Sequence, residues 1–373
     1  MRNRFILSVF LILLLLLAGC IPNQQANVQE AESEKRIELN NSTVSDSRQA
    51  NQDTRESRQP DKVVKNEKNA PEASNNPLPE ESIPDIVEPK KADKARLVVT
   101  RNYGESIIYS EWVEIPDKQD ALSLTSAYLD VKTSYGGSFV NSINGLESGY
   151  TNNKVANSKK EDWFLYFNGV LAGCGAENIK VKSSDVVWWD HHSWEASAFT
   201  PAMIGAFPHP FTTGVVLAYS PSAREAADQL ANTLTNQGIK PVNLQKIDEK
   251  VIERRESPVI LLGLRTEINA IPAIQSLNSN LPRTGLFCSF DDTGFKLWDE
   301  AIKQARAVKG SGYACIEATA TGMADPNPLW LVVAETPKDL ISAVDFLGHF
   351  NINPSCAWGV ILGPQGVISL PVR

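Results

Sequence analysis

The sequence contains no phenylalanine, tryptophan or tyrosine from Ile21 to Ala95, although the whole chain of 373 residues has 13 Phe, 8 Trp and 8 Tyr. Asn, Gln, Ser, Glu, Lys and Pro dominate this stretch, and charges of both signs alternate along it. Such a segment cannot bury enough apolar surface to offset the entropy that is lost on ordering. We therefore predict that residues 21–95 form a disordered tether, stiffened near its end by the prolines of NPLPEESIPDIVEPKK.

The chain also lacks an excess of basic residues. It has 36 Lys and Arg against 44 Asp and Glu, which gives a formal net charge of −8 at pH 7. A protein that binds nucleic acid usually carries a clustered positive surface, and this composition offers no such footprint. Nucleic acid is therefore not expected as a partner.

Signature motifs of common enzymes are missing as well. The sequence has no GxSxG elbow, no GxxxxGK[ST] phosphate loop and no GxGxxG fingerprint after a strand. Cys315 in GYACIEATATG is interpreted as a core residue, and Asp291 and Asp292 as turn residues that are favoured for backbone reasons. The sequence thus predicts a protein that is not an enzyme, with no catalytic residue and no catalytic cofactor.

Cysteine is scarce. After Cys20 only Cys174, Cys288, Cys315 and Cys356 remain, and none of them forms the CxxC pair that is typical of zinc or thioredoxin-like sites. Their apolar or glycine-containing surroundings favour buried free thiols. One disulfide remains the alternative, because the expected compartment permits it.

The first twenty residues, MRNRFILSVFLILLLLLAGC, have the composition of an export signal. Arg2 and Arg4 precede an apolar run, Phe5 to Leu17, that is too short for a confident membrane span. The run ends in Leu-Ala-Gly-Cys20, which resembles the lipobox of bacterial lipoproteins. This resemblance implies that Cys20 is lipidated, as with palmitate, and becomes the new N-terminus; an uncleaved anchor helix is the alternative. Either way the chain is expected at the cell membrane, facing the extracytoplasmic side.

A first folded domain is predicted at residues 96–196. RLVVTRNYG and SIIYSEWVEI have the apolar alternation of strands, DALSLTSAYLDV has the spacing of a short helix, and SFVNSINGLES leads from a strand into an Asn-Gly turn. Further along, Trp163 to Phe167 is predicted as a strand, followed by an Asn168-Gly169 turn, a return strand over Val170 to Leu171 and a last strand from Asp185 to Asp190.

These residues carry a family resemblance. INGL, a polar insertion, WFLYFNG, a glycine-alanine loop, a Ser-Asp turn and VVWW together resemble the transcobalamin-like C-terminal domain, over approximately residues 96 to 194. Where the family usually has a Gly-Asp turn, Ser184-Asp185 stands here. The resemblance implies an α+β module with a β-grasp-like sheet and one helix. In vertebrate cobalamin carriers this module closes one side of the ligand cleft, and a large helical barrel, of which this sequence shows no sign, closes the other.

The aromatic residues of the two strands point to both faces of the expected sheet. In a strand, alternate side chains face opposite ways, so Trp188 and Trp189 lie on different faces. The helix is expected to pack on one face of the sheet. The other face either packs on the second domain or offers an aromatic surface to a large ligand. The residues suspected of binding a ligand are Trp163, Tyr166, Asn168, Trp188 and Trp189.

The stretch WWDHHSW raises the question of a metal site. Strand alternation places Asp190 and His192 on one face and turns His191 to the other, so adjacent histidines cannot chelate one ion together. Glu195 or His209 would have to complete the ligand set. Polar residues at the end of a strand are common, and no metal site is predicted.

A second domain is predicted at residues 211–373, after a proline- and glycine-containing connector, SWEASAFTPAMIGAFPHPFTTG. GVVLAYSPSAREAADQLANTLTNQGIKPVNLQKI has the order of a βαβ unit, and PLWLVVAETPKDLISAVDFLGHF repeats the strand, Thr-Pro and helix pattern. GLFCSFDDTGFKLWDE predicts a hairpin. The expected architecture is a three-layer α/β domain with a mostly parallel sheet.

Together these observations predict a membrane-anchored, extracytoplasmic binding lipoprotein that captures a corrinoid such as cobalamin, with transport proteins as further partners. The alternative is a cell-surface adhesion or cell-wall-associated module that uses the same fold as a protein-contact domain.

Overall fold

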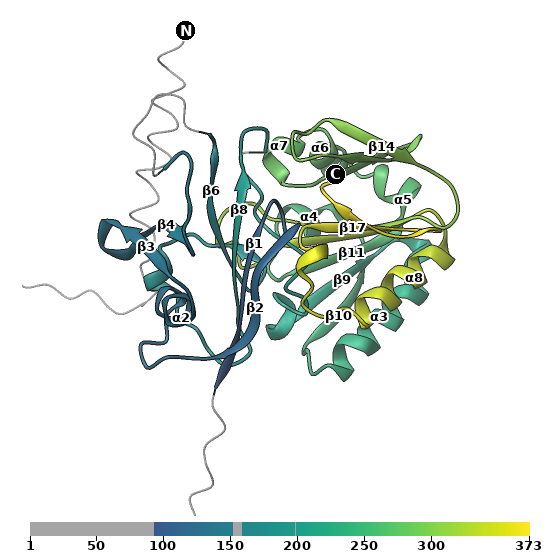
Figure 1. The fold of residues 1–373 in the computed structure, drawn as a ribbon. Helices are drawn as coiled ribbons and strands as arrows, with labels where there is room; N and C mark the ends of the chain where they lie inside the picture. The colour runs from purple at the N-terminus through teal and green to yellow at the C-terminus, as the bar shows by residue number, and fades with distance from the viewer. Residues whose placement is uncertain (1–92, 152–158, 198) are drawn as a thin grey trace, which may run out of the picture. The chain divides into compact units, whose positions relative to one another are not determined.

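The computed structural model describes residues 93–151, 159–197 and 199–373 (Figure 1). The predicted signal peptide with Cys20, and the predicted tether up to residue 92, lie outside the described residues. Within the described ranges no helix combines the length and apolar character that a membrane span requires. The chain from Lys91 to Arg373 belongs to one compact unit.

The N-terminal part of this unit is built on a five-stranded sheet with the strand order β2-β1-β8-β6-β7. Its strands are β1 (Lys94–Arg101), β2 (Ser106–Glu114), β6 (Glu161–Phe167), β7 (Val170–Leu171) and β8 (Val186–Ser193). One face is covered by helix α2 (Ala121–Tyr128). A small sheet accompanies it, formed by β3 (Val131–Ser134), β4 (Phe139–Ile143) and β5 (Leu146–Glu147).

Strand β8 lies in the middle of the five-stranded sheet. It pairs in parallel with β1 and antiparallel with β6, and its residues from Val186 to His192 are all buried. The sequence had indicated a last strand that ends at Asp190. The strand continues to Ser193 because β1 and β6 hydrogen-bond to it on both sides, so the polar end of WWDHHSW belongs to the core.

The C-terminal part is built on a seven-stranded sheet with the order β10-β9-β11-β16-β15-β17-β18. The strands are β9 (Val215–Tyr219), β10 (Val242–Lys246), β11 (Val259–Leu264), β15 (Ala314–Thr319), β16 (Leu329–Ala334), β17 (Gly359–Gly363) and β18 (Gly366–Leu370). The three pairings among β10, β9, β11 and β16 are parallel, and the three from β16 to β18 are antiparallel. The expectation of a mostly parallel sheet is therefore right only for one half, because β15 runs antiparallel to both of its neighbours and β18 returns from β17 through a short turn.

The helices of this part divide into two long ones and several short ones. The α-helices are α3 (Arg224–Asn236), α4 (Glu249–Glu253), α5 (Arg265–Asn269), α6 (Pro272–Asn278), α7 (Leu281–Thr284) and α8 (Pro337–Gly348). Short 3-10 turns occur at η1 (Tyr135–Gly137), η2 (Ala176–Asn178), η3 (Phe211–Thr213), η4 (Pro221–Ala223) and η5 (Pro354–Cys356). Helix α8 starts where the sequence predicted it, because the Thr336 hydroxyl accepts a hydrogen bond from the Asp339 N–H and Pro337 occupies the first turn.

The two faces of the seven-stranded sheet are covered differently. Helices α3 and α8 run side by side along one face (Figure 1), and alternate residues such as Ile260 and Trp330 pack under them. The other face carries the short helices α5 to α7 and a three-stranded sheet of β12 (Cys288–Asp291), β13 (Gly294–Trp298) and β14 (Gln304–Val308). The predicted βαβ unit β9-α3-β10 and the predicted hairpin β12-β13 are confirmed.

The same hydrophobic cluster also takes in one face of the five-stranded sheet. Trp188 and Tyr166 from that sheet share it with Leu261 and Leu331 from the seven-stranded sheet. The division into domains at 96–196 and 211–373 stays a prediction, but one of the three hydrophobic clusters is shared by the two regions. A mixed α and β fold is established, with β1 starting two residues before the predicted boundary, at Lys94.

The middle of the predicted connector is buried, partly in the shared cluster and partly in the cluster under α3 and α8. Met203, Ile204, Ala206, Phe207 and Phe211 are all at most 1 % exposed. The segment is fixed by backbone hydrogen bonds, since the N–H groups of residues 204 and 205 both donate to the carbonyl of residue 357 at 2.8 Å. It therefore works as a packing element between two sheets.

Candidate functional site

The aromatic residues suspected of binding a ligand are buried. Trp163, Tyr166, Trp188 and Trp189 are at most 9 % exposed, and each has a polar partner for its N–H or O–H group. The indole N–H of Trp188 donates to the Thr100 hydroxyl at 2.9 Å. None of the four rings offers its face to solvent in this arrangement.

The structure divides these rings between the two faces of the five-stranded sheet. Trp163 and Trp189 pack in the cluster beneath helix α2, whereas Tyr166 and Trp188 face the seven-stranded sheet. The sequence left open whether the second face packs on the rest of the protein or offers a surface to a ligand. In the described residues it packs against the seven-stranded sheet. These four side chains do not form one surface, and their role in ligand binding stays a prediction.

Asn168, the fifth suspected residue, holds a turn together. It lies in the left-handed region with φ of 51°, next to Gly169. Its side-chain oxygen accepts the Val186 N–H at 2.8 Å, and its amide donates to Asp185 at 2.9 Å. Asn168 thereby links the β6–β7 turn to the start of β8.

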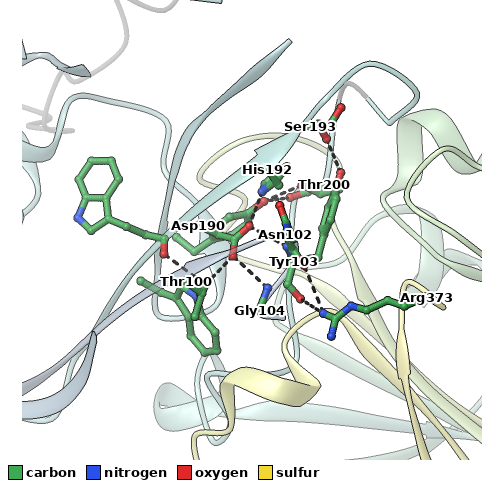
Figure 2. A network of polar contacts seen from close by, with 12 residues as sticks. Thr100, Asn102, Tyr103, Gly104, Asp190, His192, Ser193, Thr200 and Arg373 are labelled. Atoms are coloured by element: carbon green, nitrogen blue, oxygen red, sulfur yellow. Dashed lines mark hydrogen bonds and ion pairs between the residues drawn. The ribbon is translucent and has the colours of Figure 1, made fainter. Parts of the chain in front are cut away.

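The polar end of β8 forms a buried network (Figure 2). Asp190 is fully buried, and its carboxylate accepts four hydrogen bonds. Oδ1 accepts from the Tyr103 N–H at 3.0 Å and lies 2.7 Å from His192 Nδ1; Oδ2 accepts from the Gly104 N–H at 3.0 Å and from the Thr100 hydroxyl at 2.5 Å. A carboxylate has about four acceptor positions, so its capacity is fully used.

Two of these donors come from the turn between β1 and β2. Asn102, Tyr103 and Gly104 all have positive φ, so successive backbone N–H groups point into one concavity, a geometry that binds anions. At Gly104 a Cβ atom would lie only 2.1 Å from the Pro354 carbonyl oxygen, so no other residue fits. Arg373 donates to the Tyr103 carbonyl from the other side at 3.4 Å.

His192 is enclosed by aromatic rings. Its imidazole stacks between Tyr103 and Phe164, with centroid distances of 4.3 Å to each, and the nearly perpendicular ring of Trp358 has its centroid 5.7 Å away. Asp190 and His192 share a face, as alternation predicted, and their contact is internal. His209, one of the proposed further metal ligands, instead contacts the Ser184 carbonyl at 3.0 Å. Among the described residues no group of three or more His, Cys, Asp or Glu side chains is arranged to hold a metal ion.

Burial sets the electrostatics around β8. It raises the pKa of Tyr103 and Tyr166 well above the usual value of tyrosine, so both phenols stay neutral. His191 points to the opposite face and contacts the Glu147 carbonyl at 3.1 Å. Burial lowers its pKa and that of His209, which favours neutral imidazoles.

An exposed aromatic residue lies elsewhere, on the hairpin between β3 and β4. Tyr135 is 84 % exposed, more than any other large hydrophobic side chain in the described part of the chain. Its φ is 52°, an unusual conformation for a bulky residue, and the following Gly136 and Gly137 also have positive φ. Strain of this kind concentrates at ligand contacts and switch regions.

The base of this hairpin is fixed. The Tyr135 ring meets the edge of Phe139 at 6.4 Å between centroids, and Ser138 donates to Glu177 of η2 at 2.7 Å. Sequence reasoning missed this site, although the signal was present: an aromatic residue followed by two glycines in SYGGSF. Periodicity identifies helices and strands such as α2 and not the turns between them, so it did not indicate Tyr135.

These features define a small mixed α and β module with a buried polar strand at its centre and an exposed aromatic turn at one hairpin. A family profile described as "Domain of unknown function (DUF4430)" matches residues 119–193, from the turn before α2 to the end of β8. The matched part includes both the Tyr135 hairpin and the Trp188-Trp189 pair. No curated protein matches the chain.

Proposed function

We propose that the chain is a lipid-anchored, extracytoplasmic binding lipoprotein whose transcobalamin-like, β-grasp-like module captures a corrinoid at the β3–β4 hairpin. The observation that carries this proposal is Tyr135, an exposed tyrosine in a left-handed conformation at the tip of an otherwise fixed hairpin. The lipobox-like LAGC supports attachment through Cys20, and the family match over residues 119–193 is compatible with the resemblance.

The hairpin has the properties of a contact for a flat ligand. An exposed tyrosine ring offers an apolar face together with a hydroxyl group that can donate or accept. A Cβ atom added at Gly136 would meet nothing within 4 Å, so the backbone beside the ring is open to close approach. A corrin ring with its amide side chains presents an apolar plane and polar edges, which this combination complements.

The second candidate is a cell-surface adhesion or cell-wall-associated module. The burial of Trp163, Tyr166, Trp188 and Trp189 favours it, because the broad aromatic face that would suit a large ligand is used for packing inside the protein. In that case the hairpin would contact another protein or the wall. Retention on purified cell walls without affinity for corrinoids would support this candidate.

Calorimetric titration of the intact chain with cobalamin and cobinamide tests the corrinoid proposal. We expect binding by the unmodified protein and an affinity reduced about 5-fold or more in Tyr135→Ala, since losing an aromatic contact costs about 1–3 kcal/mol. Tyr128→Ala is the matched control, because it removes a tyrosine that is 40 % exposed on helix α2 and should leave the affinity unchanged.

The absence of heat at high micromolar concentrations of both corrinoids would remove the proposal. Equal losses in the two tyrosine variants would also contradict the assignment of the hairpin, because a general effect on folding would then explain them.

A further inference from the structure

Two cysteines from different sheets meet in the shared core. Cys288 begins β12 in the three-stranded sheet, and Cys315 lies on β15 in the seven-stranded sheet. Both are 1 % exposed and belong to the same hydrophobic cluster, and their side chains lie close enough to interact. In this structure both are free thiols.

A buried carboxyl fixes the alignment of these two strands. Glu317 follows Cys315 by two residues and so lies on the same face of β15. Its side chain accepts the Phe287 N–H at 3.0 Å and also the backbone N–H of Cys288. The start of β12 is thereby held directly over β15, and the thiol contact is a fixed feature of the packing between two sheets.

We propose that Cys288 and Cys315 are joined by a disulfide in the exported protein, and that the structure with free thiols is the reduced form. This inference rests on the proposed extracytoplasmic location, where disulfides persist. The other two cysteines have different surroundings. Cys356 is near Ser369 at 3.9 Å, and Cys174 is only partly buried in a loop before η2.

The chemistry requires an external oxidant. The two thiols lose two protons and two electrons as the S–S bond forms, and the electrons reduce the disulfide of an extracytoplasmic thiol–disulfide oxidoreductase to a dithiol. Burial raises the pKa of both thiols in the folded chain, which makes thiolate scarce there. Oxidation therefore takes place while the chain folds, before the two sheets close over the sulfur atoms.

Peptide mapping of the full lipoprotein, extracted from membranes and alkylated under denaturing conditions without reductant, tests the proposal. Trypsin cleaves at lysines and arginines between the two cysteines, so Cys288 is found in residues 284–296 and Cys315 in residues 310–338. We expect these two peptides to be linked, with Cys174 and Cys356 alkylated. Alkylated Cys288 and Cys315 would overturn the proposal, and so would linkage of either one to another cysteine.

A second measurement separates this inference from the question of location. The reduced, unfolded chain is refolded in a mixture of reduced and oxidised glutathione, where the same linked pair is expected regardless of where the protein resides. Lipidation of Cys20, read from the mass of the N-terminal peptide, reports on export independently. A linked pair in refolded protein together with free thiols in lipidated membrane protein would overturn the disulfide while leaving the proposed function intact.

Thermal unfolding provides the matched comparison. Closing a loop between positions 288 and 315 should raise the Tm by about 5–10 °C. Reductant should therefore lower the Tm of the unmodified protein and leave Cys288→Ser and Cys315→Ser unaffected. Cys356→Ser is the control, and it should keep the full response to reductant; the same response in Cys288→Ser would contradict the proposal.

Discussion

At the scale of single residues, Asp190 shows how an acidic side chain is accommodated in the middle of a sheet. Its four hydrogen bonds come from the Thr100 hydroxyl, the backbone N–H groups of Tyr103 and Gly104, and His192. All four partners supply donors toward the carboxylate. Asp190→Asn keeps the size of the side chain but turns an NH₂ group toward two of those donors.

We expect Asp190→Asn to lower the free energy of unfolding by about 3 kcal/mol, because breaking a buried, hydrogen-bonded charge leaves its partners unsatisfied. Urea denaturation followed by tryptophan fluorescence measures this change. Asp228→Asn is the control, since Asp228 pairs with Arg224 on the exposed side of α3 and its loss should not move the midpoint measurably. A wild-type midpoint in Asp190→Asn would mean that the network contributes no stability.

At the scale of elements, the segment from Ala202 to Phe207 packs between Trp188 of the five-stranded sheet and Ala357, which precedes β17. Gly205 lies against Trp188, and a Cβ atom there would be 2.8 Å from the indole ring and 2.9 Å from the Ala357 Cα atom. We expect Gly205→Ala to lower the free energy of unfolding by about 1–3 kcal/mol, as overpacking of a dense core does. Chemical denaturation measures the change.

Gly322→Ala is the control for this substitution. A Cβ atom at Gly322 meets nothing within 4 Å, and the backbone there is not in the left-handed region, so the change should be neutral or stabilising by up to about 1 kcal/mol. If both variants behaved alike, the contact between Gly205 and Trp188 would not limit the packing.

The same elements show what sequence patterns can and cannot predict. Local signals predicted α3, the cap of α8 and the strands around Trp163 and Trp188, because periodicity and turn residues act over a few positions. The burial of residues 202–207 was not predictable, since it depends on residues far away in sequence, such as Ala357 beside Gly205 and Trp330 beside Phe207. The central position of β8 likewise depends on parallel pairing with β1 about ninety residues earlier.

In the candidate site, too, local features were predictable from the sequence and tertiary contacts were not. Alternation correctly separated Trp188 from Trp189 and joined Asp190 with His192, since that is a property of any strand. What covers each face is decided by tertiary packing, so the sequence alone did not exclude an open aromatic platform. Tyr135 was overlooked for the opposite reason: its exposure and backbone conformation are properties of a hairpin tip, which has no periodicity.

At the scale of the whole molecule, the buried Glu317 connects the three-stranded and seven-stranded sheets and makes stability depend on pH. Burial raises its pKa well above the usual value, despite hydrogen bonds from two backbone N–H groups. The folded state therefore retains a proton that the unfolded chain releases above about pH 4.3. Stability attributable to this group is present at low pH and is lost as pH rises toward the folded pKa.

We therefore expect Glu317→Gln to gain stability relative to the unmodified protein as pH rises, by about 1.4 kcal/mol for each pH unit between roughly pH 5 and the folded pKa. The glutamine oxygen still accepts the Phe287 N–H, and any cost of burying its amide group is the same at every pH. Urea denaturation of both proteins from pH 5 to 8 gives the difference in the free energy of unfolding.

His191 and His209 also make stability depend on pH, because their lowered pKa values remove stability as pH falls below about 6.5. Both proteins contain these histidines, so their effect cancels in the difference. A difference that does not change with pH would show that Glu317 is ionised in the folded protein. Glu317→Leu should show the same change with pH, displaced by a constant loss because it leaves the two N–H groups unpaired.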